Sequence, residues 1–139
     1  MYYVNREQIA VRLNSITEVA SALQSLAANW QGTLLEGLAQ ERALHLAIET
    51  VTDVGSFLID GFILRDASSY EDIIEITGEA GAFPADMQAT LTELVKLRKP
   101  LVQDYYVWKR TELHPLTEVL STLMPAFKEA VEGYLEREL

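Results

Sequence analysis

Cysteine is absent from the 139 residues, so disulfide bonds, thiolate metal sites and a cysteine nucleophile are excluded. The N-terminal stretch MYYVNREQIAVRL lacks the basic segment and the apolar core of a signal peptide. The most apolar stretch, VTDVGSFLIDGFIL, is too short for a membrane span and is interrupted by Asp53 and Asp60. We therefore expect a cytoplasmic protein without a membrane anchor.

Length and composition are those of a folded domain. Hydrophobic residues make up 49% of the chain and charged residues 23%, which is ordinary for a globular protein. A chain of this length can bury a sizeable core. We predict one domain covering residues 1–139.

The net charge of −10 argues against general nucleic-acid binding. The basic residues are nevertheless unevenly distributed. Residues 96–110 contain five basic residues opposed only by Asp104, so this window carries +4 and the remainder −14. The five are Lys96, Arg98, Lys99, Lys109 and Arg110. Such a basic island can hold one anionic ligand or one acidic partner, although a solvated helix face is the simpler alternative.

Apolar residues recur at helical spacing through almost the whole chain, and no segment alternates as a strand does. The seams are Ile9, Leu13, Ile16, Ala20, Leu23 and Ala27; Leu44, Ile48, Val51, Gly55, Leu58 and Phe62, preceded by Leu34, Leu35 and Leu38; Met87, Leu91, Leu94, Arg98, Leu101 and Tyr105; and Leu116, Leu120, Leu123, Phe127, Val131 and Tyr134. Seams that average 3.5 residues per step are typical of near-parallel helix packing. We predict an all-α, up-and-down bundle of four main helices.

A short additional helix is expected between the second and the third seam. Ser68 and Glu71 have the spacing of a capping box, and Tyr70 and Ile73 would face inward. Proline marks other boundaries, since Pro84 suits a first helical turn, and the last helix should begin at residues 114–115. Pro125 lies inside that last helix and should kink it.

Arg98 is unexpected, because it occupies an apolar seam position beside a proline. Pro100 has no N–H, so the carbonyl of Lys96 loses its helical partner and the turn should open. A kink there can turn Arg98, Gln103 and Tyr105 toward a common point.

The second helix offers partners for this arginine, because His45, Glu49 and Asp53 follow at intervals of four residues. A buried ion pair of Arg98 with Glu49 or Asp53 is one interpretation. The other is an electropositive pocket for a phosphate, in which the acids position the arginine. A third is that this face meets a second subunit. The stripe is a weak metal candidate, and we favour arginine positioning.

The segment RKPLVQDY, residues 98–105, resembles the R-N-x-L-V-H-x-Y signature of HepT-like proteins in the HEPN superfamily. ERALHLAIETVTDV, residues 41–54, is similar to the second-helix segment of that family. RDASSYEDIIEITGEAG, residues 65–81, resembles its R-x-P-x-S-Y-x-D-x-x-x-x-L stretch. The order and spacing of the three pieces agree with the family over most of the chain.

The resemblance implies a HEPN-like helical bundle that dimerises through its signature helices and places two motifs in one cleft. Active members cleave RNA there without metal, so we expect no cofactor. HepT-type proteins are toxins paired with a minimal nucleotidyltransferase (MNT) antitoxin, which can transfer AMP to the motif tyrosine. Carried over by position, the motif arginine is Arg98 and the tyrosine, the AMP-acceptor candidate, is Tyr105.

The chain departs from the motif at two positions. Gln103 stands where the family has histidine, and an amide side chain cannot transfer protons near neutral pH. Gln103 can still form hydrogen bonds to a phosphate or a ribose. Lys99 replaces the asparagine that follows the arginine. His45 and His114 lie outside the motif position; either imidazole could compensate for the missing histidine, but a structural role is the expectation for each.

Three functions follow from these observations. The first is a dimeric module that binds a nucleotide, RNA or an MNT-type partner, with Lys96, Lys99 and Lys109 as binding residues. The second is a weakened, metal-independent ribonuclease toxin. The third is a purely structural bundle. Loss of the motif histidine places the binding module slightly ahead of the ribonuclease.

Overall fold

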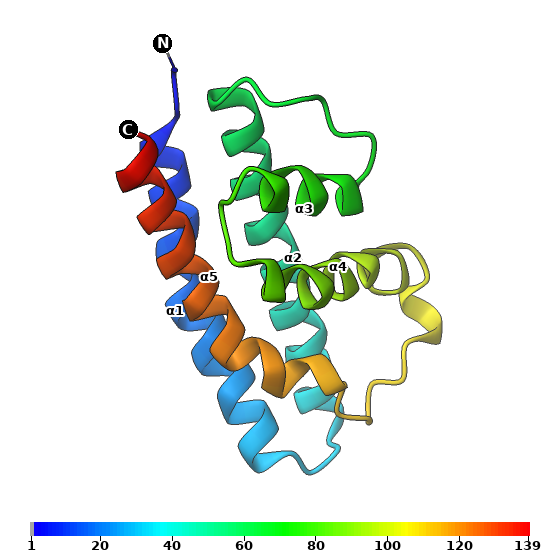
Figure 1. Ribbon diagram of the computed structural model, residues 1–139. Helices are drawn as coiled ribbons and strands as arrows, with labels where there is room; N and C mark the ends of the chain where they lie inside the picture. The colour runs from blue at the N-terminus through cyan, green and yellow to red at the C-terminus, as the bar shows by residue number, and fades with distance from the viewer. Residues whose placement is uncertain (1) are drawn as a thin grey trace.

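The computed structural model describes residues 2–139 and shows five α-helices with no strand among those residues. The helices are α1 (Arg6–Asn29), α2 (Leu34–Gly61), α3 (Tyr70–Glu79), α4 (Gln88–Lys96) and α5 (Pro115–Glu138). The all-α prediction is confirmed. Helices α1 and α5 lie side by side along the long axis of the molecule, and α3 and α4 cross α2 (Figure 1).

Side chains cap the beginnings of the helices. Asn5 accepts a hydrogen bond from the N–H of Gln8 at the start of α1. Thr33 and Glu36 form a reciprocal capping box at the start of α2, which satisfies backbone N–H groups that have no helical partner. At α3 the predicted cap is wrong by one residue, because Ser69 rather than Ser68 accepts from the helix backbone.

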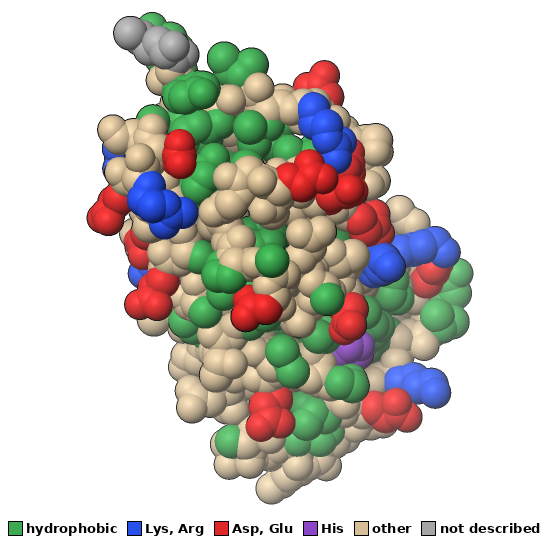
Figure 2. Space-filling model, viewed as in Figure 1, with side chains coloured by type: hydrophobic (Ala, Val, Ile, Leu, Met, Phe, Trp, Pro, Cys, Tyr) green, Lys and Arg blue, Asp and Glu red, His purple; other side chains and the backbone are tan. Residues whose placement is uncertain are grey.

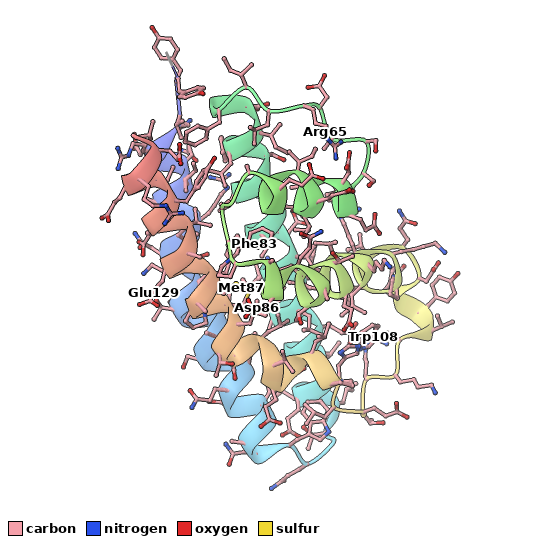
Figure 3. All side chains as sticks on the ribbon, viewed as in Figure 1. Arg65, Phe83, Asp86, Met87, Trp108 and Glu129 are labelled. Carbon is pink, nitrogen blue, oxygen red and sulfur yellow. The ribbon has the colours of Figure 1, made fainter. Side chains whose placement is uncertain are left out.

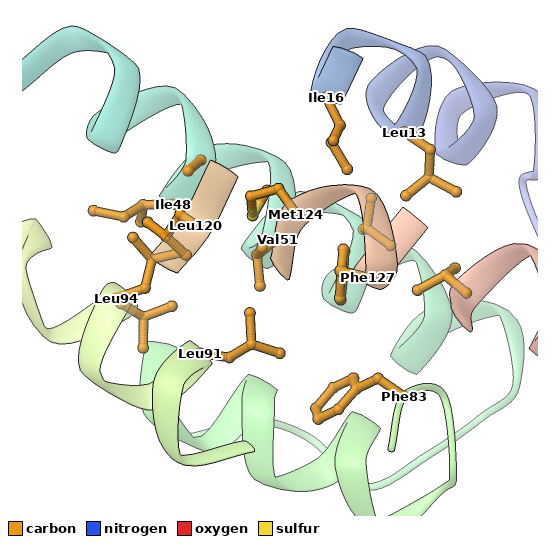
Figure 4. Close-up of a cluster of buried hydrophobic side chains, with 14 of the residues drawn as sticks. Leu13, Ile16, Ile48, Val51, Phe83, Leu91, Leu94, Leu120, Met124 and Phe127 are labelled. Atoms are coloured by element: carbon orange, nitrogen blue, oxygen red, sulfur yellow. The ribbon is translucent and has the colours of Figure 1, made fainter. Parts of the chain in front are cut away.

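The core forms where α1, α2, α4 and α5 meet (Figure 4). Leu13 and Ile16 of α1 face Met124 of α5, and Leu91 and Leu94 of α4 close the opposite side. Each of these side chains is almost completely buried, and a fully buried Leu or Ile stabilises the fold by about 1.5–3 kcal/mol. The predicted seams therefore identify most of the core.

Several residues that were expected to face inward are exposed. Leu34, Leu35 and Leu38 are exposed, whereas Gly37 and Gln40 in the same turns of α2 are buried. Tyr70 was expected inside α3 but is also exposed. Helix α5 continues through Pro125 to Glu138.

The fourth helix is shorter than its seam predicts. Helix α4 ends at Lys96, and the chain continues as one turn of π-helix, Lys99–Gln103, and one turn of 3₁₀-helix, Tyr105–Val107. Pro100 lies in the π-helical turn, where the N–H of Asp104 reaches back five residues to the carbonyl of Lys99 at 3.0 Å. A proline that opens the helical ladder accounts for this widened turn.

Within residues 2–139, the helices are either too short or too polar to cross a bilayer.

Candidate functional site

The motif residues lie where the chain leaves α4. Arg98 is at the junction with the π-helical turn, and 28% of its side chain is exposed. Gln103 is exposed at the end of that turn. Tyr105 was predicted on the apolar seam, but it is 55% exposed and its ring packs edge-on against Tyr106. The prediction that Tyr105 faces the core is wrong because α4, and with it the helical periodicity, ends at Lys96.

Arg98 is held by residues from two other helices. Its Nε lies 3.8 Å from Oε1 of Glu49 on α2. Its guanidinium stacks over the ring of Tyr70 on α3, 4.5 Å from the ring centroid, which is a favourable cation–π distance. The Nε atom is buried and makes no hydrogen bond within the described chain. A guanidinium that is oriented but not fully hydrogen-bonded is suited to accept an additional anionic ligand.

Of the two predicted acidic partners of Arg98, only Glu49 faces it. Asp53 instead forms an ion pair with Arg12 of α1, with Nε and Oδ2 3.0 Å apart. Arg12 also lies over the ring of Phe57, 4.9 Å from its centroid. Glu49 and Asp53 therefore each have their own arginine. Sequence reasoning missed Arg12, because nothing in its local pattern shows that α1 packs beside this face of α2.

His45 completes the group around Glu49. Its Nε2 lies 3.2 Å from Oε1 of Glu49, the same oxygen that faces Arg98. Its Nδ1 lies 3.3 Å from Nη1 of Arg42. No hydrogen bond, ion pair or ring contact joins Arg98 to Gln103 or Tyr105 within residues 2–139, so their convergence on one ligand stays a prediction.

Carboxylates neutralise much of the basic island. Lys99 forms an ion pair with Asp104 at 3.3 Å, and Arg110 pairs with Glu41 of α2 at 2.7 Å. Lys96 and Lys109 are exposed, and neither forms an ion pair with another described residue. Figure 2 shows basic and acidic side chains interspersed on this face. The island is therefore less positive than its sequence suggests, and its free charges are the two lysines.

A buried glutamine anchors the segment that follows the motif. Gln40 of α2 is completely buried; it donates to the carbonyl of Glu112 at 3.0 Å and accepts from the N–H of His114 at 2.8 Å. Three residues earlier, Gly37 passes so close to the carbonyl of Arg110 that a Cβ there would overlap it. The start of α2 thus fixes the path of residues 110–114. A polar residue on an apolar helix face was the only sequence signal for Gln40.

His114 has the structural role that was expected. Its Nδ1 accepts a hydrogen bond from the N–H of Leu116 and so caps α5. Its ring stacks on that of Trp108, which Figure 3 labels, with centroids 5.6 Å apart. Burial lowers the pKa of His114. The two rings line an open pocket of about 260 Å³, together with Pro100.

No group of three or more histidine and acidic side chains in residues 2–139 has the arrangement of a metal site. The stripe of His45, Glu49 and Asp53 is divided between two arginines instead. Of the two acids predicted to position Arg98, Glu49 lies beside it, whereas Asp53 pairs with Arg12.

Comparison with known proteins identifies the family of this chain. The model of the family described as "Ribonuclease HepT-like" matches residues 12–133. The "Putative RNase YutE" of Bacillus subtilis (strain 168) is 37% identical over 139 residues, which are 100% of this chain and 95% of that protein. The structure of YutE, described as a cytosolic protein of unknown function from Bacillus subtilis, superposes with a TM-score of 0.91 at 34% identity, covering 100% of this chain and 96% of the other. The chain belongs to the HepT-like ribonuclease family.

Proposed function

We propose that this protein binds RNA through the surface around Arg98, as a single cytoplasmic domain that acts as a homodimer. The observation that carries the proposal is the state of Arg98 itself. Glu49 and the ring of Tyr70 orient the guanidinium, and 28% of the Arg98 side chain remains exposed to a ligand. A phosphate oxygen is the acceptor that a guanidinium in this position binds best.

The surroundings support a nucleic acid rather than a free anion. Lys96 and Lys109 are unpaired cations on the same segment of chain, and they can follow a phosphate backbone. The exposed rings of Tyr105 and Tyr106 can stack on unpaired bases. The rest of the surface is acidic, so binding should be confined to this region.

Fluorescence anisotropy with a short single-stranded RNA tests this proposal. We expect Arg98→Ala to weaken binding at least tenfold, since it removes a charge-assisted contact. Lys109→Ala should lower the slope of log affinity against log salt by about 0.7, the value for one phosphate contact on a single strand. Arg6→Ala, at the far end of α1, is the matched control and should bind as the wild type does. Equal affinity of the wild type and Arg98→Ala would disprove this site.

A second candidate function is metal-independent RNA cleavage. The specific observation in its favour is that His45, a titratable group, shares the Glu49 carboxylate with Arg98. Cleavage by the wild type, by Gln103→His and by Arg98→Ala separates the two functions. Cleavage by the wild type that Arg98→Ala abolishes supports the ribonuclease. Cleavage by Gln103→His alone supports a binding module that has lost its proton-transfer residue.

We also propose a toxin–antitoxin context for this chain, with an MNT-type nucleotidyltransferase as partner. The exposed Tyr105 hydroxyl is accessible to an active site on another protein. In AMP transfer, the tyrosine oxygen bonds to the α-phosphorus of ATP and pyrophosphate leaves. Incubation with an MNT protein and ATP should add one AMP to the wild type and none to Tyr105→Phe. Equal labelling of both chains would exclude Tyr105 as the acceptor.

A further inference from the structure

One carboxylate oxygen connects the motif arginine to a histidine outside the motif. Oε1 of Glu49 lies 3.2 Å from Nε2 of His45 and 3.8 Å from Nε of Arg98. The side chains of His45 and Arg98 are 29% and 28% exposed, so solvent or a ligand reaches both. The motif position itself offers only the amide of Gln103. His45 is therefore the imidazole that the structure links to Arg98.

The neighbours of His45 determine which of its nitrogens carries the proton. Nη1 of Arg42 lies 3.3 Å from Nδ1, and a guanidinium can only donate, so Nδ1 is the acceptor. The carboxylate of Glu49 can only accept, so the proton is on Nε2. His45 thus has the arrangement of an oriented base, in which the carboxylate of Glu49 favours the Nε2–H tautomer and Nδ1 is left as the acceptor that faces the exposed Arg42.

The lone pair on Nδ1 is covered by a single exposed group. Arg42 lies on the surface, and its contact with Nδ1 is long for a hydrogen bond. Among the charged groups around His45, Glu49 is one turn onward on α2 and Arg98 approaches from the end of α4. Glu41, one turn earlier, is occupied by Arg110. A ribose hydroxyl can therefore displace Arg42 without breaking the pair of His45 with Glu49.

We infer that His45 is the proton-transfer residue of this site and replaces the histidine that is missing at Gln103. The inference rests on the proposed RNA binding at Arg98 and specifies its chemistry. Nδ1 takes the proton of a ribose 2′-hydroxyl, the 2′-oxygen bonds to the adjacent phosphorus, and the bond from phosphorus to the 5′-oxygen breaks. The 5′-oxygen keeps the electron pair and takes a proton from water, and the imidazolium returns its proton to solvent.

The charges at the site suit this step. The imidazolium that forms is next to Glu49, which stabilises its positive charge. The guanidinium of Arg98 stabilises the negative charge that develops on the phosphate oxygens. Glu49 is a positioning residue in this scheme, since it acts on both groups without contacting the RNA. The products are an RNA end with a 2′,3′-cyclic phosphate and one with a 5′-hydroxyl.

Two measurements on the same proteins test the inference. The first is binding of a short single-stranded RNA by anisotropy, and the second is its cleavage as a function of pH. We expect the wild type to cleave and His45→Gln to lose about 10²- to 10⁴-fold in rate, the usual contribution of a general base. His45→Gln should also lose the pH dependence in the range where imidazole titrates, while its RNA affinity stays within about twofold. Glu49→Gln should reduce the cleavage rate less than His45→Gln does.

The control is His114→Asn, which removes the only other histidine and should retain both binding and cleavage. Absence of RNA binding by the wild type would refute the proposed function and, with it, this inference. Binding without cleavage would refute the inference alone, as would equal cleavage rates for the wild type and His45→Gln.

A structural readout covers the case in which His45→Gln folds poorly. With two histidines in the chain, long-range ¹H–¹⁵N spectra resolve the tautomer of each ring. We expect the Nε2–H tautomer for His45 in the wild type. A proton on Nδ1 instead would leave no base directed toward solvent and would overturn the inference.

Discussion

The side-chain oxygen of Gln40 accepts a 2.8 Å hydrogen bond from the backbone N–H of His114, a residue 74 positions later in the chain. The same oxygen accepts from the hydroxyl of Thr117 at 2.6 Å, and the amide nitrogen donates to the carbonyl of Glu112. All polar atoms of this buried side chain are thus used. The position of the segment between the motif and α5 depends on this one residue.

Replacement of Gln40 by leucine is predicted to destabilise the fold. It leaves the N–H of His114 and the hydroxyl of Thr117 without an acceptor, and each buried unsatisfied group costs about 1–3 kcal/mol. Urea unfolding at neutral pH measures the loss. Gln24→Leu, on the exposed face of α1, is the matched control and should change the free energy of unfolding by less than about 0.5 kcal/mol. Similar losses of unfolding free energy in both variants would show that the hydrogen bonds of Gln40 do not stabilise the fold.

Gly37→Ala should also destabilise, although alanine is the better helix former. The new Cβ would overlap the carbonyl of Arg110, so either α2 or the segment after the motif must move. Gly133→Ala in α5 is the control, because its Cβ would meet only the flexible end of Arg137, at 3.5 Å. That variant should gain up to about 1 kcal/mol from helix propensity. Thermal unfolding of the two proteins should therefore shift in opposite directions.

His114 makes stability depend on pH on the acidic side of neutrality. Burial holds its pKa below the ordinary value of 6.5, although the nearby carboxylate of Glu93 acts in the opposite direction. The unfolded chain therefore takes up this proton first as the pH falls. The free energy of unfolding should decrease from about pH 6.5 downward until the folded-state pKa is passed, and its full value is present above pH 6.5.

His114→Asn tests this pH dependence, because asparagine caps a helix without titrating. Unfolding by urea at a series of pH values should give a flatter profile for this variant between about pH 5 and 7. Identical slopes in the variant and the wild type would show that another group is responsible. His45→Gln provides the comparison with the second histidine.

Asp72 is predicted to stabilise the connection between α2 and α3 except in strong acid. Both carboxylate oxygens of Asp72 accept hydrogen bonds from Arg65, which Figure 3 labels, at 2.9 Å. These bonds, together with that from the N–H of Ser68, lower the pKa of Asp72 from 3.8 to about 2. This contribution is present above about pH 4 and is lost as the pH falls through about 2. Asp72→Asn should be less stable than the wild type at neutral pH, but it should lose less stability than the wild type does on acidification. The exposed Asp66→Asn should behave as the wild type does.

The proposed dimer makes a prediction about Arg98. If two motifs form one cleft, the chain should sediment as a dimer at micromolar concentration, and Arg98→Glu should weaken the dimer or its anion binding. If Arg98 serves only its own chain through Glu49, the same variant should mainly lower stability. Sedimentation velocity and urea unfolding of both proteins distinguish these outcomes. A wild-type monomer would contradict a cleft shared by two subunits.

The candidate site could be predicted only in part. Helical periodicity placed Arg98 on the seam of the fourth helix and left both Glu49 and Asp53 of the second helix as its candidate partners; the structure places Glu49 beside it. The assignment of Asp53 to Arg12 does not follow, since it requires the packing of α1 on α2. The exposure of Tyr105 was not predicted, because the prediction extended the helical periodicity through Pro100. The widened turn at Pro100 ends that periodicity before Tyr105.

The sequence by itself determined the all-α fold, the core-facing seams and the family, because apolar periodicity, caps and the spacing of the motif are local properties of the chain. Tertiary structure alone decided that His45 and Arg98 share one oxygen of Glu49, and that Gln40 fixes the segment after the motif. These contacts join residues far apart in sequence, and their geometry depends on how the helices pack against one another. The chemistry proposed for this protein therefore follows from helix packing more than from its motif.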